Sequence, residues 1–215
     1  MRVKQQSAVP PLLGINVVVF IIQMIFPAFT EAFVLRQGDL FTAPWTLLTS
    51  MFMHGSFPHI LFNMFVLMMF GPIIEQRIGM KRFLGIYLVS GIAAGVAASF
   101  FYTAALGASG AIMGILGVTI ILIPDLQVLF FFFIPMSLRT AGIIIAAIDI
   151  FGIFVPTGVA NIAHLGGLAT GLAYGYYLLK AKRRFNKVVI EKPRRKKTIE
   201  MDDEDIDRYV RNGRL

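Results

Sequence analysis

The sequence predicts an all-α fold, in which six transmembrane helices form the bundle of a polytopic membrane protein. Hydrophobic residues make up 57% of the 215 residues and charged residues only 15%, with a mean hydropathy of +0.74. A soluble domain of this size could not bury that much apolar surface. The apolar residues also gather in six long runs, separated by shorter polar or charged segments. The chain has no cysteine, which excludes disulfides and thiolate metal sites.

The six apolar runs give the expected helices in chain order. The first run, 12–29, is about long enough to cross a bilayer, and no small-residue cleavage site follows it, which favours a retained helix over a signal peptide. The region after it, 30–57, is an expected long loop with an interfacial part around Trp45. The short apolar segment 128–136 is expected to be interfacial or re-entrant, because it contains Pro135. The other expected spans are 59–74, 83–102, 111–123, 140–155 and 161–179.

The composition changes near residue 180, which predicts three parts. Residues 1–10 are expected to form a cytoplasmic N-terminal segment, 11–180 the six-helix domain, and 181–215 a charged, disordered cytoplasmic tail. Most lysines and arginines lie in this tail, so the net charge of +8 indicates topology and contact with anionic lipid. No nucleic-acid partner is expected.

The charges between the spans predict the orientation. Six spans place both termini on one side of the membrane. The loops of the opposite side carry only Arg36. The positive-inside rule therefore predicts that both termini are cytoplasmic. The basic residues that precede the tail on the cytoplasmic side are Arg2, Lys4, Arg77, Lys81, Arg82 and Arg139.

Three polar residues lie near the outer ends of three expected helices in this topology: His59, Ser109 and His164. Such residues within a membrane protein usually face the bundle interior and have a function. Ser109 can simply cap its helix. The flanking Gly107 and Gly110 also suit a nucleophile, because other backbone can come close and the first-turn N–H groups can stabilise an oxyanion.

Glycines on the fourth and sixth expected helices predict close packing of these two helices. They recur every three or four residues and so mark one face of each helix, which permits close approach. This packing brings His164 within hydrogen-bonding reach of Ser109, which is the pair needed to activate a serine nucleophile. The glycines are Gly110, Gly114 and Gly117 on the fourth helix, and Gly167, Gly171 and Gly175 on the sixth.

His59 and Asn63 are four residues apart and share one face of the second expected helix. They can direct donors to an oxyanion, or they can hold helices together by hydrogen bonds. His164 can likewise be a packing residue bonded to a backbone carbonyl. His54 and His59 are five residues apart, on different helix faces, with no carboxylate nearby in sequence, so no metal site is expected.

Asp149 lies inside the fifth expected span. It could be the third member of a triad with Ser109 and His164. In the predicted topology, however, it is near the middle of the membrane and deeper than these two residues. A structural hydrogen-bonding role is therefore expected for it.

Four motifs together resemble those of the rhomboid intramembrane serine proteases, in their bacterial-type six-helix form. The resemblance covers about residues 10–180 and is specific because the motifs occur together, in order and on the expected helices. They are His54-Gly-Ser-Phe-Pro-His59-Ile-Leu-Phe-Asn63, Glu75-Gln-Arg77, Gly107-Ala108-Ser109-Gly110 and Ala163-His164-Leu-Gly-Gly167-Leu-Ala-Thr-Gly171.

The resemblance implies a Ser109–His164 catalytic dyad without an acid, and an oxyanion hole formed by His59, Asn63 and the Ser109 backbone N–H. It implies an enzyme without a cofactor that cleaves transmembrane protein substrates near the outer face of the lipid bilayer, in a bacterial cell (inner) membrane. The supporting residues that it implies are His54, Gly107, Gly110, Gly167 and Gly171.

Two positions depart from the family pattern. Trp45 is followed by Thr46, where the family often has Trp-Arg, so the anchoring of the loop can differ. Met113 stands four residues after the serine, where some members have an aromatic residue stacked on the histidine. A methionine can still pack against an imidazole, but it orients the ring less firmly.

Two other function classes stay open at this point. A proteolytically inactive rhomboid-like factor that binds membrane proteins would not need both Ser109 and His164, yet both are present. A transporter or channel is compatible with six helices and Asp149, but the sequence shows neither an inverted repeat nor a pair of broken helices.

Overall fold

The computed structural model describes residues 6–131, 133–155, 158–191 and 204, with backbone only for 182–191. The chain forms two compact units, Met1–Lys180 and Ala181–Leu215. The elements that build the site belong to the first unit. Most of the predicted tail lies outside the described residues, as do the first five residues of the predicted N-terminal segment.

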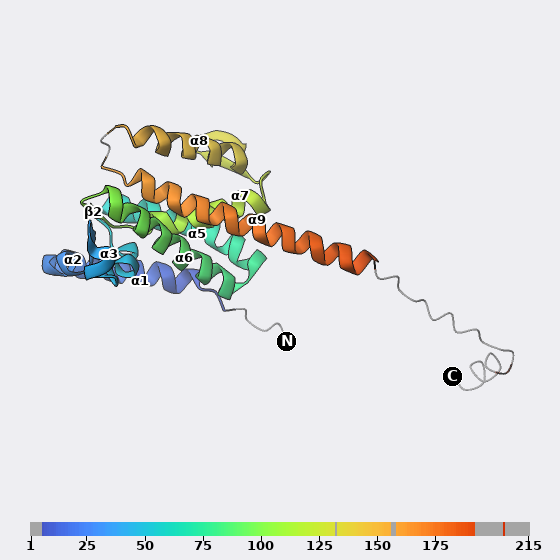
Figure 1. The fold of residues 1–215 in the computed structure, drawn as a ribbon, viewed down its shortest axis with the longest axis horizontal. Helices are drawn as coiled ribbons and strands as arrows, with labels where there is room; N and C mark the ends of the chain where they lie inside the picture. The colour runs from blue at the N-terminus through green and yellow to red at the C-terminus, as the bar shows by residue number, and fades with distance from the viewer. Residues whose placement is uncertain (1–5, 132, 156–157, 192–203, 205–215) are drawn as a thin grey trace. The chain divides into compact units, whose positions relative to one another are not determined.

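The described chain is mainly helical, which confirms the helical part of the predicted fold class (Figure 1). Six helices of 14 or more residues coincide with the six apolar runs. Two of them, α5 and α6, are long and apolar enough to cross a membrane, and α1 and α7 are shorter apolar helices. The six are α1 (Val9–Ile25), α5 (Phe57–Ile78), α6 (Met80–Phe101), α7 (Ser109–Leu122), α8 (Leu138–Gly152) and α9 (Asn161–Glu191).

Helix α7 lies at the centre of the first unit and packs against α5, α6 and α8. Every residue from Gly110 to Thr119 is buried. A helix surrounded by protein on all sides needs no polar face, which explains why its sequence is apolar throughout. The site residue at its first position, Ser109, is therefore carried by the most enclosed helix among those described.

The predicted glycine contact between α7 and α9 is confirmed. A Cβ added at Gly167 would lie 2.0 Å from the carbonyl oxygen of Gly110, and one added at Gly171 would lie 2.0 Å from that of Gly114. Real Cβ atoms do not approach other atoms so closely. The two helices therefore meet through their backbones, at a distance that only glycine permits.

The N-terminus of α1 is tied to the C-terminal part of α5 by Glu75. Its carboxylate accepts the Ala8 backbone N–H at 2.6 Å and a hydrogen bond from the Ser7 hydroxyl. These bonds satisfy a free N–H group at the start of α1 and place negative charge at the positive end of the helix dipole. Helix α1 is thereby fixed against the bundle.

The first apolar run and the following loop are more structured than predicted. Helix α1 ends at Ile25, and α2 (Pro27–Phe33) begins a new helix at Pro27, because a proline cannot donate a backbone N–H within a continuing helix. The predicted loop contains β1 (Leu35–Arg36), α3 (Asp39–Thr42), α4 (Thr46–Thr49) and the 3₁₀ helix η1 (Ser50–Phe52). Strand β1 pairs antiparallel with β2 (Ala104–Ala105), which leads toward Ser109.

The segment between α7 and α8 forms a β-hairpin, which the sequence did not predict. Strands β3 (Gln127–Phe130) and β4 (Ile134–Ser137) pair antiparallel, with Gln127 opposite Ser137. Each strand has four residues, which is too short to cross a bilayer, so the segment agrees with the prediction that it is not a span. A nearly continuous apolar run carries neither the helical nor the strand period, so its strands leave no pattern in the sequence.

Replacing Gly171 by alanine is expected to lower the thermal stability of the protein. The added Cβ would lie 2.0 Å from a backbone atom of Gly114, so the two helices must move apart, and overpacking of this kind costs about 1–3 kcal/mol. The matched control is Gly85→Ala on α6, where an added Cβ meets nothing within 4 Å. Equal melting temperatures of the two variants in detergent would contradict the contact.

Candidate active site

Ser109 is the first residue of α7 and is held there by the backbone before it. Gly107 has a φ of +127°, which L side chains rarely adopt. Its N–H donates to the Ser50 carbonyl of η1 at 3.0 Å. Strand β2, which precedes this turn, also pairs with β1. The long loop after α1 therefore holds the turn before Ser109 at two points, through Ser50 and through β1.

The predicted partner of Ser109 lies within hydrogen-bonding distance of it. His164 belongs to the first turn of α9, and its Nε2 is 2.9 Å from Oγ of Ser109. The His164 side chain is 19% exposed. The close α7–α9 contact starts one turn further on, at Gly167, so the packing of the two helices holds this pair in register.

Asp149 contacts the other side of the same imidazole. Its Oδ1 is 3.0 Å from Nδ1 of His164, and the residue is only 4% exposed. The prediction that Asp149 lies deeper than the serine–histidine pair is wrong. Helix α8 ends at Gly152, earlier than the apolar run suggests, which places Asp149 in the last turn of the helix, beside the start of α9.

His59 lies next to the serine on a third helix. A Cβ added at Gly107 would lie 2.8 Å from Cε1 and Nε2 of His59 and 3.7 Å from Oγ of Ser109. The His59 ring therefore covers the glycine that precedes the serine. The Ser56 hydroxyl accepts the backbone N–H of His59 at 3.3 Å and caps α5, which fixes where this ring enters the site.

Asn63 lies one turn further along α5 and is 4% exposed. Its Nδ2 is buried and has no hydrogen-bond partner within the part of the chain that the structure describes. A buried amide donor without a partner costs free energy, so a residue placed only to join helices would normally be paired. This donor is available to a ligand.

His54 supports His59 from the loop before α5. The two rings meet edge to face, with centroids 5.1 Å apart, and the His54 backbone N–H donates to Oε1 of Gln23 at 2.9 Å. Burial, followed by the nearby His59, lowers the pKa of His54 to about 4, so the ring is neutral near pH 7.

Among the described residues, no group of three or more His, Asp or Glu could hold a metal ion.

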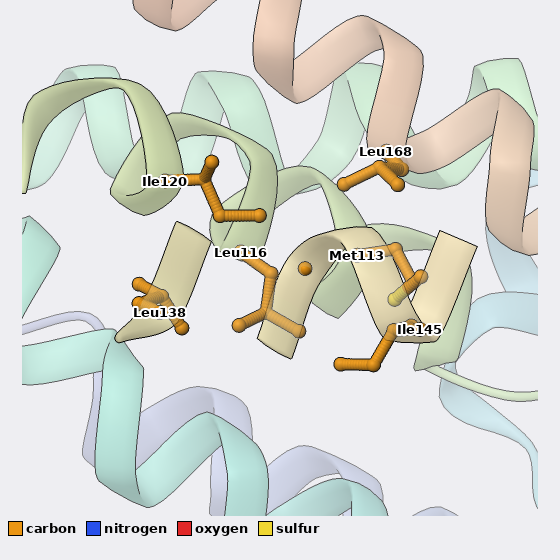
Figure 2. A pocket seen from close by; sticks show the side chains of 7 residues that line it. Met113, Leu116, Ile120, Leu138, Ile145 and Leu168 are labelled. Carbon is orange, nitrogen blue, oxygen red and sulfur yellow. The ribbon is translucent and has the colours of Figure 1, made fainter. Parts of the chain in front are cut away.

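A small cavity one turn along α7 from Ser109 is lined by apolar residues. Figure 2 shows a small cavity between α7, α8 and α9, in which Met113 and Leu116 of α7 face Ile145 of α8. Leu138 and Leu168 complete its wall together with Ile120 and Gly142. The cavity has no charged or hydrogen-bonding side chain in its lining, so it is a packing gap next to the site and offers a ligand no polar contact.

Comparison with known proteins now decides the family. The family model described as the Rhomboid domain matches residues 42–181, which is more than half of the chain. The chain belongs to the rhomboid family. Rhomboids are membrane-embedded helical proteins and include intramembrane proteases.

Several relatives carry rhomboid names. "Rhomboid protein 1, mitochondrial" of Saccharomyces cerevisiae is 32% identical over 188 residues, which is 82% of this chain and 54% of that protein. "Rhomboid protease GluP" of Bacillus subtilis is 36% identical over 66% of this chain and 26% of its own length. Human "Presenilin-associated rhomboid-like protein, mitochondrial" is 36% identical over 61% of this chain and 37% of its own length.

The chain spans about half or less of the length of these relatives. Two of them are named as mitochondrial proteins, and the third comes from a bacterium. The family membership confirms that the chain is a membrane protein. Because the relatives come from both mitochondria and bacteria, they do not support the predicted bacterial inner membrane or the bacterial-type form.

The neutral state of His54 predicts a pH dependence of stability. Its pKa is about 4 in the folded protein against an ordinary 6.5, so the unfolded chain binds a proton first as the pH falls. The free energy of unfolding is therefore highest above pH 6.5. It falls as the pH is lowered toward 4, by up to about 3 kcal/mol.

Unfolding in detergent as a function of pH tests this prediction. The variant His54→Gln should lose less stability than the wild type between pH 6.5 and 4, because it lacks the titrating ring. The difference between the two proteins isolates His54 from the carboxylates that titrate in the same range. Parallel stability curves would show that His54 is not held neutral by the fold.

Proposed function

We propose that this rhomboid is an intramembrane serine endopeptidase, with Ser109 as the nucleophile and His164 as the general base. The observation that carries the proposal is the 2.9 Å contact between Oγ of Ser109 and Nε2 of His164, at the start of a buried helix. In the first step, Nε2 takes the hydroxyl proton while Oγ attacks the scissile carbonyl. The proton then passes to the leaving amine, and water hydrolyses the acyl-enzyme.

The oxyanion of the tetrahedral intermediate has three candidate donors. The backbone N–H of Ser109 lies at the N-terminus of α7, where the helix dipole favours negative charge. His59 lies beside the serine, and Asn63 contributes a buried amide donor. Donors that are already in place when charge develops need no reorganisation, which is the main source of catalysis in such sites.

The proposed topology has six spans, with both termini on the cytoplasmic side. The polar residues come from the starts of α5, α7 and α9 and from the end of α8. An alternating antiparallel arrangement brings these four helix ends to one side of the bundle. The basic Arg77, Lys81 and Arg82 lie at the opposite ends, around the turn between α5 and α6, as the positive-inside rule requires for a cytoplasmic face.

The proposed substrates are transmembrane segments that are cut near the outer face. Hydrolysis needs water, which the bilayer core lacks, and a helical peptide bond must first unwind. Unwinding costs less near the interface and where glycine or proline weakens the helix. The closely packed helices around Ser109 favour small substrate residues beside the cut. The aromatic side chains of the first loop, Phe41 at 85% and Trp45 at 54% exposure, suit contact with the outer leaflet.

The alternative is a proteolytically inactive rhomboid that binds membrane proteins. Such a protein needs neither a serine–histidine hydrogen bond nor an unpaired buried donor. Both features are present here. They favour the protease, as does the relative that is named a rhomboid protease.

Ser109→Ala and His164→Ala are each expected to abolish cleavage of a reconstituted single-span substrate. The first variant removes the nucleophile, and the second removes its base. A fluorophosphonate probe should label the wild type at Ser109 and neither variant. Thermal stability should stay near that of the wild type, because each change removes few contacts.

Mass spectrometry of the products locates the cut in the same experiment. Turnover by the Ser109→Ala protein would refute the nucleophile. Cuts clustered at the cytoplasmic end of the substrate helix would contradict the proposed orientation.

Asn63→Ala is expected to lower kcat by about 10²–10³, the usual effect of removing one oxyanion donor, with KM nearly unchanged. The matched control is Asn16→Ala on α1, another buried asparagine, whose amide donates to the Leu12 carbonyl at 2.7 Å. The control should affect stability only. An unchanged kcat in the Asn63 variant would make this residue a packing residue.

A further inference from the structure

We propose that Asp149 is a positioning residue that acts through His164, so that the site is a Ser–His–Asp triad. The inference rests on the proposed protease function and adds a third member to the predicted dyad. Its basis is a continuous hydrogen-bonded line across three helices. Oδ1 of Asp149 on α8 lies 3.0 Å from Nδ1 of His164 on α9, whose Nε2 lies 2.9 Å from Oγ of Ser109 on α7.

The first effect of this contact is on the tautomer. A carboxylate can only accept, so the proton of a neutral His164 imidazole is held on Nδ1. The lone pair of Nε2 is then directed at the Ser109 hydroxyl, which is the state that a general base needs. Without Asp149, the neutral ring can carry its proton on either nitrogen, and one of the two forms cannot accept the serine proton.

The second effect is on orientation. A ring held at one nitrogen can still turn about its side-chain bonds, whereas a ring held at both nitrogens is fixed in its plane. Asp149 itself has little freedom, because it lies in the last turn of α8 and is 4% exposed. The imidazole is therefore held between the last turn of α8 and the first residue of α7.

The hydrogen bonding of Asp149 argues against a purely structural role. A structural aspartate usually caps a helix or accepts backbone N–H groups. The one hydrogen bond described for this side chain goes to His164, and its Oδ2 is buried with no partner among the described residues. Burying a carboxylate in a membrane protein with so few bonds is costly, and such residues usually serve a function.

The triad accounts for each proton. When Oγ of Ser109 forms its bond to the substrate carbonyl carbon, its proton moves to Nε2 and the imidazole becomes positively charged. The Asp149 carboxylate stabilises this charge through Nδ1–H and takes no proton itself. The proton on Nε2 is then given to the leaving amine as the peptide bond breaks, and the ring returns to its neutral form.

The test is Asp149→Asn, which keeps the size of the side chain. The amide can donate to Nδ1 and so favour the wrong tautomer. Cleavage by the reconstituted variant should show a kcat lower by about 10²-fold or more, with little change in KM. The rate of fluorophosphonate labelling at Ser109 should fall by a similar factor, because it reports the same activated hydroxyl without a protein substrate.

The matched control is Thr119→Val on α7. Thr119 is fully buried, and its hydroxyl donates to the Ile115 carbonyl at 2.7 Å. This variant also removes a buried polar group from the bundle, but near the opposite end of α7 from Ser109. It should keep the wild-type kcat and labelling rate, so a general effect of losing a buried hydrogen bond is separated from positioning.

The outcomes separate the two proposals. An Asp149→Asn protein with wild-type kcat and labelling rate overturns the triad, whether or not its melting temperature falls, because Asp149 would then be structural. If kcat falls by the same factor in Asp149→Asn and in Thr119→Val, the triad is also overturned. A wild type that is neither labelled at Ser109 nor active contradicts the proposed protease itself.

Discussion

The backbone contact between α7 and α9 determines where the site residues lie. In lipid, apolar side chains gain little by leaving one apolar environment for another, so helices associate through close packing and hydrogen bonds. Gly167 and Gly171 of α9 lie against the carbonyl oxygens of Gly110 and Gly114. Because this contact involves no side-chain rotamers, it sets the distance between the first turns of the two helices, where the serine and histidine lie.

The polar groups gather where helix ends meet, and loops hold these ends in place. Ser109 follows a turn that the first loop fixes, through the Gly107–Ser50 hydrogen bond and the β1–β2 pair. A buried polar group costs less where neighbouring donors and acceptors satisfy it. Helix ends offer free N–H and C=O groups and lie nearer to water than helix centres do. The proposed hydrolysis needs water, which is more accessible at helix ends than at helix centres.

The sequence predicts the helices and the serine–histidine pair well, because both leave strong local patterns. Long apolar runs mark the helices, and glycines at helical spacing mark the α7–α9 contact. Asp149 was misplaced because residues 153–155 are apolar and hide the end of α8 at Gly152. The β1–β2 pair joins residues about seventy positions apart, and two-residue strands have no period to detect. Such non-local contacts become visible only in the fold.

The contact between Asp149 and His164 is consistent with a position at which the sequence departs from the family pattern. Where some rhomboids have an aromatic residue that stacks on the histidine, this chain has Met113, whose flexible side chain faces the apolar cavity of Figure 2. Stacking restrains the tilt of a ring but leaves its tautomer free, whereas a carboxylate at Nδ1 restrains both. If Asp149 provides this restraint, the reactivity of Ser109 depends on the position of α8. Any displacement of α8 from α9 would then weaken the base before it separated the serine from the histidine.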